Sequence, residues 1–477
     1  MKLDLQELYK QNEYTVTVND NLRNETFELW RNSLVAASRY FDMIFVASGE
    51  IVKVYSQNAL LFGEEDIEEL FTLKSAFSTT NRRPGRTHTF MEHVINRLSI
   101  VCQGTVELLI VLDDSGKVQI YQTDDLNRAP QVYEVSDSAW GLAFSSQRIL
   151  AVSANSHNIE MFHLGTEYSS KFNDYRSRWF HTSKLVLVGH NHNIPNISFD
   201  STGRYIASVS IDCSLRVWDL YELHSCAVFY SYLCGWGVCF LEDNDFQKLD
   251  LKSMTEAKIQ TAKNYGSSAP SITTEQDYIS FYSRENEFDD TIFEGDHNVL
   301  LDENLHNVED FFLASLTEEP DALLLYATHR TVTLLAFING NRLMPLASSK
   351  NMFENPLDSR TDVFQRVNMI EKIPGLHCVV CVSQSGQITI LHLVSTIIMR
   401  KEKQYRSWSF VPQLIHLTHV VDSPIIGLSV SPVYHGQEDM FLRFYIILVT
   451  YSGKVITIEI KRTASAVDPL HLSHIIL

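Results

Sequence analysis

The sequence is poor in the features that define several classes of protein. Only 7 cysteines occur among 477 residues, an odd and scattered set that predicts free thiols in a reducing compartment. No uncharged apolar run approaches the ~18 residues that a membrane helix needs, and Met1–Lys10 lack the apolar core of a signal peptide. We therefore expect a soluble protein of the nucleus, the cytoplasm or both, which is not secreted and has no membrane partner.

Positive charge is also in deficit. The chain has 39 Lys and Arg against 58 Asp and Glu, a formal net charge of −19. A surface that grips nucleic acid needs concentrated Lys and Arg, so no direct nucleic-acid binding is expected. The hydrophobic content of 45% is ordinary for a globular protein. The length suits either about three ordinary domains or one large repeat architecture.

The motifs of common catalytic sites are missing. The sequence contains no GxxxxGK[ST], no GxGxxG after a strand, no GxSxG and no HExxH. None of the 18 histidines stands at metal-ligand spacing from cysteines or carboxylates. Alternation along an apolar run directs Cys378 and Cys381 to opposite faces of a strand, which favours buried structural cysteines over a redox or zinc pair. We expect no catalytic, cofactor-binding or metal-binding residues and no enzyme.

Internal repetition is the most informative feature of the chain. The segment Leu187–Asp219 resembles a WD40 repeat from its Gly-His pair to its Trp-Asp pair, with three β-prone runs separated by turn residues. The resemblance implies a structural hydrogen-bonded network within the segment. A catalytic interpretation of its histidine, aspartate and serine is disfavoured because the repeat already explains their spacing. The residues expected in this network are His190, Asp212, Trp218, a serine at Ser208 or Ser210, and Asp219.

Six other segments show the same alternation of β-prone runs and turns but lack the Gly-His and Trp-Asp dipeptides. In each segment an apolar run, a turn and a second run with an aliphatic second residue predict a β-hairpin. Seven hairpins predict an all-β fold, a single seven-bladed WD40-like β-propeller with long loop insertions over residues 14–460, followed by a tail at 461–477. The first strands are Met43–Ser48, Leu108–Leu112, Ile149–Ala154, Tyr205–Ser210, Leu323–Ala327, Cys378–Ser383 and Tyr445–Thr450. The second strands are Ile51–Tyr55, Lys117–Tyr121, Asn158–Phe162, Ser214–Trp218, Thr331–Leu335, Gln387–Leu391 and Lys454–Ile458.

The longest interval between hairpins holds an acidic insertion. A gap of 117 residues separates the register positions Trp218 and Leu335, enough for an eighth blade. Asp243–Asp310 lack alternation, however, so we expect a partly disordered acidic insertion over residues 241–320. The part from Leu241 to Asp310 has 17 acidic and 5 basic residues, a net charge of −12. Aromatic residues among these acids suggest a segment that orders on a basic protein surface, and a passive loop is the alternative. The candidate contacts are Phe281, Tyr282, Phe288 and Phe293.

A second insertion is expected at residues 63–90. Ile67, Leu70 and Phe71 fall at helical spacing after an acidic start, so the pattern predicts a helix over Asp66–Phe77. The helix could cap a blade edge, or its apolar side could dock a partner protein.

Several short sequence motifs in the last two-thirds of the chain resemble those of one fungal family. They occur in the family's order from Ser138 to Ile460, and the family is the one named for constitutive RNR transcription (member ten), which regulates ribonucleotide reductase genes. The motifs are Ser138–Ala143 with Arg148–Asn155, His192–Pro195, Gly235–Val238, Arg366–Ile370 with Ile373-Pro374, and Arg443–Ile460.

The resemblance implies a non-enzymatic regulatory scaffold in the nucleus or cytoplasm that affects transcription of ribonucleotide reductase genes. It implies protein partners on the propeller rim and insertions, from chromatin or transcription complexes, and a monomer within such a complex. The alternative is a substrate receptor of a cullin-RING ubiquitin ligase, which binds a ligase adaptor. In such receptors an Arg often follows Trp-Asp by two places, and here that position is Tyr221. A propeller enzyme that uses the central channel is the lesser alternative.

Overall fold

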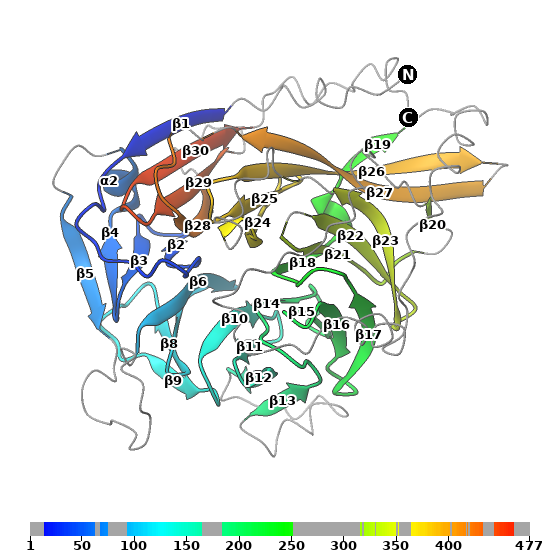
Figure 1. Ribbon diagram of the computed structural model, residues 1–477, viewed down its shortest axis with the longest axis horizontal. Coiled ribbons are helices and arrows are strands. Elements are labelled where there is room, and N and C mark those ends of the chain that lie inside the picture. Colours follow the sequence, from blue (N-terminus) through cyan, green and yellow to red (C-terminus); the bar gives the residue numbers. More distant parts are fainter. Residues whose placement is uncertain are drawn as a thin grey trace.

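The strands of the protein form a ring of sheets around a common axis (Figure 1). The computed structural model describes residues 14–62, 67–74, 93–164, 184–250, 315–316, 319–329, 331–349, 352, 364–400, 403–415, 417, 420–432 and 443–461. Seven sheets occupy these residues, and each has at least four strands. The prediction of an all-β, seven-bladed propeller is confirmed. No helix in the described part of the chain is long and apolar enough to cross a membrane.

Four consecutive strands build most blades, each antiparallel to the next. Blade 1 consists of β2 (Val35–Ala37), β3 (Ile44–Ser48), β4 (Ile51–Tyr55) and β5 (Glu69–Lys74). Blade 2 consists of β6 (Ile95–Gln103), β7 (Val106–Asp113), β8 (Lys117–Gln122) and β9 (Gln131–Glu134). Blade 3 consists of β10 (Ala139–Phe144), β11 (Ile149–Ala154), β12 (Asn158–His163) and β13 (Leu185–Val188). Blade 4 consists of β14 (Asn196–Phe199), β15 (Tyr205–Val209), β16 (Ser214–Asp219) and β17 (His224–Tyr230).

The other three blades contain strands that are not consecutive in the chain or extra strands from elsewhere in it. Blade 5 consists of β18 (Gly237–Leu241), β21 (Ala322–Ala327), β22 (Val332–Ile338) and β23 (Arg342–Ser349). Blade 6 consists of β24 (Val367–Ile373), β25 (Cys378–Ser383), β26 (Ile388–Arg400) and β27 (Lys403–Ile415). Blade 7 consists of β28 (Ile425–Pro432), β29 (Arg443–Thr450), β30 (Val455–Lys461) and β1 (Tyr14–Asn19). All seven predicted hairpins pair as expected.

The two ends of the described chain close the ring together. β1 pairs antiparallel with β30, from Tyr14 opposite Ile460 to Asn19 opposite Val455, and the two strands lie side by side in Figure 1. The innermost strands contact their neighbours in the order β2, β6, β10, β14, β18, β24 and β28, and β28 contacts β2 again. Because each blade repeats the same strand order, the innermost strands run in one direction. We call the face of the ring at which they begin the upstream face, and the opposite face the downstream face.

The core lies between blades and not at the axis. Both faces of the middle strands are buried, so runs such as Ile149–Ala154 are buried at every residue. Cys378 belongs to the cluster that β25 shares with blade 7, and Cys381 to the cluster shared with blade 5. Close packing also constrains Gly141 on β10, where a Cβ would lie 2.4 Å from Ser153 Oγ and 3.3 Å from the backbone of Pro195 and Asn196.

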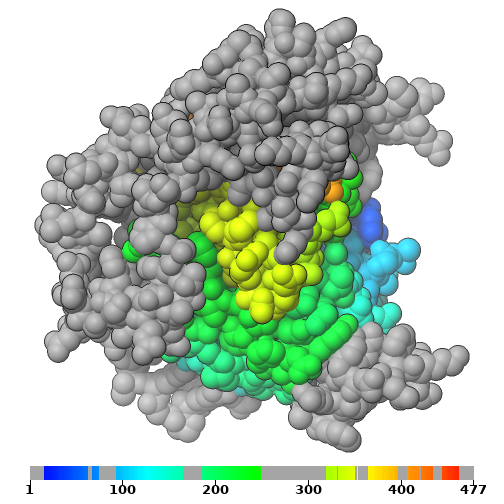
Figure 2. All heavy atoms as spheres, turned by 90° about the vertical axis from the view of Figure 1, so that its right-hand side faces the viewer, coloured from blue at the N-terminus to red at the C-terminus, as the bar shows by residue number. Residues whose placement is uncertain are grey.

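The acidic insertion begins and ends on the sheet of a neighbouring blade. After β18, a short 3₁₀ turn (Asp243–Asp245) leads into β19 (Gln247–Asp250), which pairs in parallel with β26 of blade 6. β20 (Ser315–Leu316) pairs with β27 on the other side of the same hairpin. The long β26–β27 hairpin projects from the ring (Figure 1). The outer strands of blades 4 and 5 lie side by side, as the green and yellow surfaces of Figure 2 show.

The predicted helix over Asp66–Phe77 is wrong. The described part of that segment is β5, the outer strand of blade 1, whereas the helix α2 (Gln57–Phe62) lies earlier in the chain. Leu73 pairs with Val52 and is buried, and Phe71 pairs with Val54. The free edge of β4 offers backbone hydrogen bonds and an apolar neighbour that an isolated helical segment lacks, so tertiary pairing outweighs the helical spacing.

Candidate functional site

Blade 4 brings four of the expected network residues together. His190 precedes β14, Ser208 lies on β15, Asp212 lies in the turn after β15, and Trp218 lies on β16. His190 Nδ1 lies 2.9 Å from Asp212 Oδ2, and His190 Nε2 lies 2.7 Å from Ser208 Oγ. Trp218 Nε1 donates a hydrogen bond to Ser208 Oγ at 2.8 Å. The chain of contacts joins a loop, a turn and two strands of one blade.

The electrostatics of the network fix its protonation. Burial opposes ionisation of Asp212, but hydrogen bonds from His190, Ser214 and the backbone of Asn191 hold its pKa well below the usual range. Burial lowers the pKa of His190. A neutral imidazole must then donate Nδ1–H to the carboxylate and accept the Ser208 hydroxyl proton at Nε2. Every polar atom along this line has a defined role as donor or acceptor, which suits a structural network.

Ser210 and Asp219 make different contacts from those expected. Ser210 Oγ donates to the carbonyl of His192 at 3.1 Å and accepts from the backbone N–H of Asp212 at 3.1 Å, so it shapes the turn and does not contact the imidazole. Asp219 pairs with Arg204 at 2.7 Å, on the downstream side of the blade. The choice between the two serines therefore falls on Ser208.

A second histidine–aspartate pair occurs in blade 2. His93 Nδ1 lies 2.9 Å from Asp113 Oδ2, and Asp113 Oδ1 accepts the backbone N–H groups of Ser115 and Lys117. This pair was not predicted because the residues around His93 and Asp113 lack the Gly-His and Trp-Asp motifs. One signal in the sequence could have revealed it: a His stands 20 residues before an Asp at the end of the first hairpin strand, close to the 22 residues between His190 and Asp212.

The predicted partner-binding residues divide into two groups. Ile67 and Phe71 pack partly against the core of blade 1, whereas Leu70 is 56% exposed on β5. These side chains belong to a blade edge and not to a docking helix. The aromatic residues of the acidic insertion lie outside the described residues: Phe281, Tyr282, Phe288 and Phe293.

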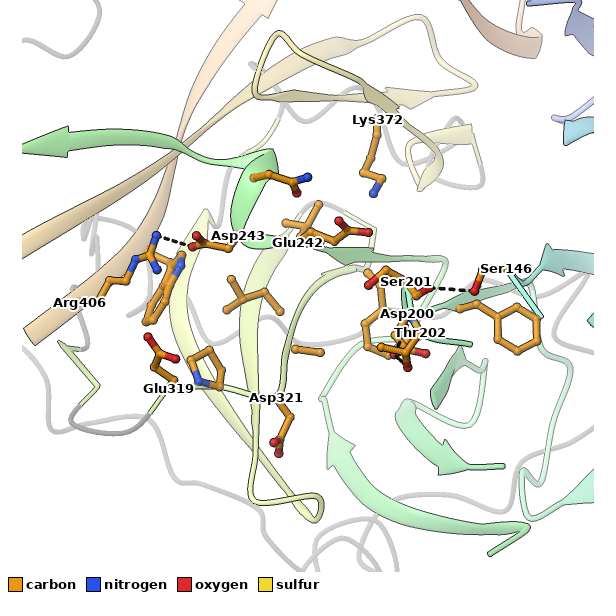
Figure 3. Close-up of a pocket in the computed structure, with 18 of the residues that line it drawn as sticks. Ser146, Asp200, Ser201, Thr202, Glu242, Asp243, Glu319, Asp321, Lys372 and Arg406 are labelled. Carbon is orange, nitrogen blue, oxygen red and sulfur yellow. Dashed lines mark hydrogen bonds and ion pairs between the residues drawn. The ribbon is translucent and has the colours of Figure 1, made fainter. Parts of the chain in front are cut away.

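The downstream face carries a cavity of about 810 Å³ at the base of the acidic insertion. Its walls come from the ends of the innermost strands of blades 3, 4 and 5, from both ends of the insertion, and from β24 and β27. Figure 3 shows acidic side chains on several sides of this cavity. Five carboxylates and two cations line it: Asp200, Glu242, Asp243, Glu319, Asp321, Lys372 and Arg406.

Both cationic side chains that line the cavity already form ion pairs. Arg406 of β27 pairs with Asp243, and Lys372 of β24 pairs with Asp245 at 3.2 Å. Although burial opposes ionisation of Asp243, hydrogen bonds from Lys248 and Arg406 lower its pKa. Glu242 and Glu319 are exposed at the rim. The cavity therefore presents a surplus of negative charge to an incoming group.

One buried donor also lines the cavity. The indole of Trp408 on β27 is only 3% exposed, and its Nε1 has no hydrogen-bond partner among the described residues. The guanidinium of Arg406 lies 5.2 Å from the centre of this ring. A buried N–H without an acceptor is unfavourable. The carboxylates of the cavity suit a basic side chain such as Lys or Arg.

A ring of seven blades with this network in blade 4 has the architecture of the WD40 repeat class. The CRT10 family model matches residues 243–402. An uncharacterized WD repeat-containing protein of Schizosaccharomyces pombe is 39% identical over 459 residues, which are 95% of this chain and 95% of that protein. The chain belongs to the CRT10 family of WD repeat proteins.

Two further similarities are more distant. A WD40 repeat-containing protein of Dictyostelium discoideum is 29% identical over 193 residues, which cover 40% of this chain and 24% of that protein. A chain in the crystal structure of the mitotic checkpoint complex is similar with a TM-score of 0.48 and 9% identity, over 93% of this chain and 92% of that chain.

Proposed function

We propose that this protein is a regulatory scaffold that affects the transcription of ribonucleotide reductase genes by holding a partner protein. The observation that supports binding is the carboxylate-lined cavity at the base of the acidic insertion. Membership of the CRT10 family supports the regulatory role. In this proposal the protein works in the nucleus, and it contributes contacts and no catalysis.

The cavity favours a partner segment with Lys or Arg. Its two cations are already paired, while Glu242 and Glu319 remain exposed at the rim. Both ends of the acidic insertion contribute to the walls, and the insertion carries a net charge of −12 between Leu241 and Asp310. The cavity and the insertion would then attract the same basic partner, with the long-range charge accelerating encounter.

The test is a charge reversal at the rim in cells. Glu242→Lys with Glu319→Lys should change the abundance of ribonucleotide reductase transcripts in the same direction as loss of the whole chain. Asp124→Lys with Glu222→Lys is the matched control, because it makes the same charge change at exposed positions outside the cavity. Equal melting temperatures of the two purified variants would show that both rings are folded.

Two results would contradict the proposal. Transcripts that are unaffected by deletion of the whole chain would exclude the regulatory role. Transcripts that change on deletion but respond equally to the rim variant and its control would exclude the cavity as the binding site.

A further inference from the structure

Buried polar atoms without partners gather at the upstream face of the ring. Several stand at or just before the first residues of innermost strands, where β-bulges shift the register of β6, β10 and β24. They come from blades 1, 2, 3 and 6. The atoms without a hydrogen-bond partner among the described residues are Arg31 Nε and Nη1, Arg97 Nε, Trp140 Nε1, Arg366 Nε and the Oδ1 atoms of Asn96, Asn155 and Asn368.

Arg31 is the most deeply buried of these cations. Its residue is 4% exposed, and two nitrogens of its guanidinium have no acceptor among the described residues. A buried cation without hydrogen-bond acceptors is costly. The negative charges in its surroundings are Glu28, Asp113 and Asp114, but burial still lowers the pKa of Arg31. Asp113 is already bonded to His93, and Asp114 Oδ1 accepts the Ser138 hydroxyl at 2.6 Å.

The backbone around Arg31 is fixed from two blades. Gln384 of blade 6 donates to the carbonyls of Leu29 and Arg31, each at 3.1 Å. Ser33 forms a parallel bridge with Arg97 of blade 2. Blades 6 and 2 therefore hold the backbone of this segment, so Arg31 does not stand on a loose loop. This rigidity is what a preorganised binding residue requires.

A second arginine of the upstream face stacks on an aromatic ring. The guanidinium of Arg366, directly before β24, lies 4.1 Å from the centre of the Trp236 ring, directly before β18. Trp236 Nε1 lies 3.3 Å from His329 Nδ1, and the two rings meet edge to face. A guanidinium stacked on an indole keeps its N–H groups available at the edge of the plane. Arg366 is half-buried, so an incoming group can reach it.

We propose that the upstream face binds a segment of a partner protein through an anionic side chain, either a carboxylate or a phosphate, with Arg31 and the Arg366 guanidinium on Trp236 as its contacts. Arginine forms paired N–H bonds to both kinds of anion. The site is distinct from the downstream cavity, which selects basic groups, and it does not depend on that proposal. The scaffold would then bind opposite charges on its two faces.

The first experiment measures binding of defined probes to the full chain. Fluorescence anisotropy would follow an eight-residue labelled peptide with four Glu, a peptide with two phosphoserines in place of Glu, and a peptide with four Lys. The acidic or the phosphorylated peptide should bind, and Arg31→Gln or Arg366→Gln should weaken that binding at least tenfold. Arg204→Gln is the matched control because Arg204 pairs with Asp219 on the downstream side, and its affinity should equal that of the unmodified protein.

The pattern of binding identifies the anion. Binding of the phosphoserine peptide alone would identify phosphate as the source of the charge, and binding of both acidic probes would identify a site for carboxylate as well. Failure of both acidic probes at millimolar concentration would overturn the proposal, as would unchanged affinity in Arg31→Gln. The Lys peptide reports on the downstream cavity, so its affinity should be the same in Arg31→Gln and in the unmodified chain. Loss of Lys-peptide binding in Arg31→Gln would overturn the assignment of Arg31 to an anion site.

A second measurement separates a binding role of Arg31 from a structural one. An unpaired buried cation destabilises the empty protein, so Arg31→Met should melt at the same temperature as the unmodified chain or higher. The bound acidic probe should raise the melting temperature of the unmodified chain and leave that of Arg31→Met unchanged. A folded Arg31→Met variant that melts well below the unmodified chain would assign Arg31 to the framework and overturn the proposal.

Discussion

Val35 of blade 1 lies directly against Gly427 of blade 7. A Cβ at position 427 would stand 2.6 Å from Val35 Cγ2 and 3.0 Å from the Val35 backbone nitrogen. The two residues lie on β2 and β28, the innermost strands on either side of the closure of the ring. Because the contact includes backbone, rotation of the Val35 side chain alone cannot make room for another carbon atom.

Gly427→Ala should therefore destabilise the ring by about 1–3 kcal/mol, the usual cost of overpacking. Urea denaturation would measure the free energy of unfolding. Val35→Ala removes part of the clash, so the double variant should be less unstable than the sum of the two single variants. Strict additivity would mean that the two strands do not constrain each other.

Trp218 offers a test of the network in blade 4. Trp218→Ala removes a 2% exposed indole from the cluster between blades 3 and 4 and should cost about 3–5 kcal/mol. Trp218→Phe preserves most of the packing and removes only the hydrogen bond to Ser208, so its cost from that bond should be about 1 kcal/mol. Chemical denaturation of both variants would separate the two contributions. A cost below about 1 kcal/mol for Trp218→Ala would show that the residue does not stabilise the blade.

His392 predicts a specific dependence of stability on pH. Burial lowers its pKa to about 4, although Nε2 forms a 2.7 Å hydrogen bond with Gln413 Oε1. The unfolded chain binds this proton near pH 6.5, so between pH 6.5 and about 4 the unfolded state holds more protons and stability falls as the pH falls. The slope should reach about 1.4 kcal/mol per pH unit.

The measurement is urea denaturation at half-unit steps from pH 7 to pH 4.5. His392→Gln should show a smaller slope than the unmodified chain, whereas His224→Gln, which changes an exposed histidine on β17, should keep it. Identical slopes in all three proteins would indicate that His392 already binds a proton in the folded ring.

The thiols of Cys213 and Cys234 should form a disulfide on mild oxidation. Their sulfur atoms lie 3.7 Å apart, and a contact with Cys213 and the charge of Arg366 lower the pKa of Cys234 despite burial. Hydrogen peroxide would take two electrons from the two thiols, forming the S–S bond and leaving as two water molecules. Mass spectrometry of unreduced peptides should find this link.

Cys378 and Cys381 provide the internal control for that reaction. They are close in sequence but point to opposite sides of β25, and burial raises the pKa of Cys378 to about 12. They should remain reduced. Oxidation of Cys378 and Cys381 before Cys213 and Cys234 would contradict the geometry.

The sequence predicted the hairpins because each one depends on local alternation and a turn. Ser214–Asp219 and its six counterparts carry that information within about twenty residues. The innermost strands β2, β6 and β24 were not predicted. β2 has only three residues, and bulges at Asn96 and Asn368 interrupt the regular pairing of β6 and β24. Pairing of β1 with β30 joins opposite ends of the described chain, which no local pattern encodes.

The candidate sites were less predictable than the fold for the same reason. The contacts among His190, Asp212 and Trp218 could be predicted from their spacing because one repeat contains all three residues. Arg31 meets Gln384 across 353 residues, and Lys372 meets Asp245 across 127. Only the closed ring places such residues side by side. The incorrect helix near Leu70 arose similarly, because helical spacing in the segment said nothing about the open edge of β4.

Because β1 completes blade 7, it stays unpaired during translation until β30 has been synthesised. β1 leaves the ribosome first, but its partner β30 ends at Lys461. At about 5–20 residues per second, β1 must wait roughly 20 to 90 s for that strand. Thr15, Thr17 and Val18 are exposed on β1 even in the finished ring. Threonine and valine favour strands, so the unpaired β1 is open to pairing with other nascent chains. Each polysome therefore carries several unfinished rings. A pause late in translation lengthens the time for which β1 stays unpaired, before β30 is made.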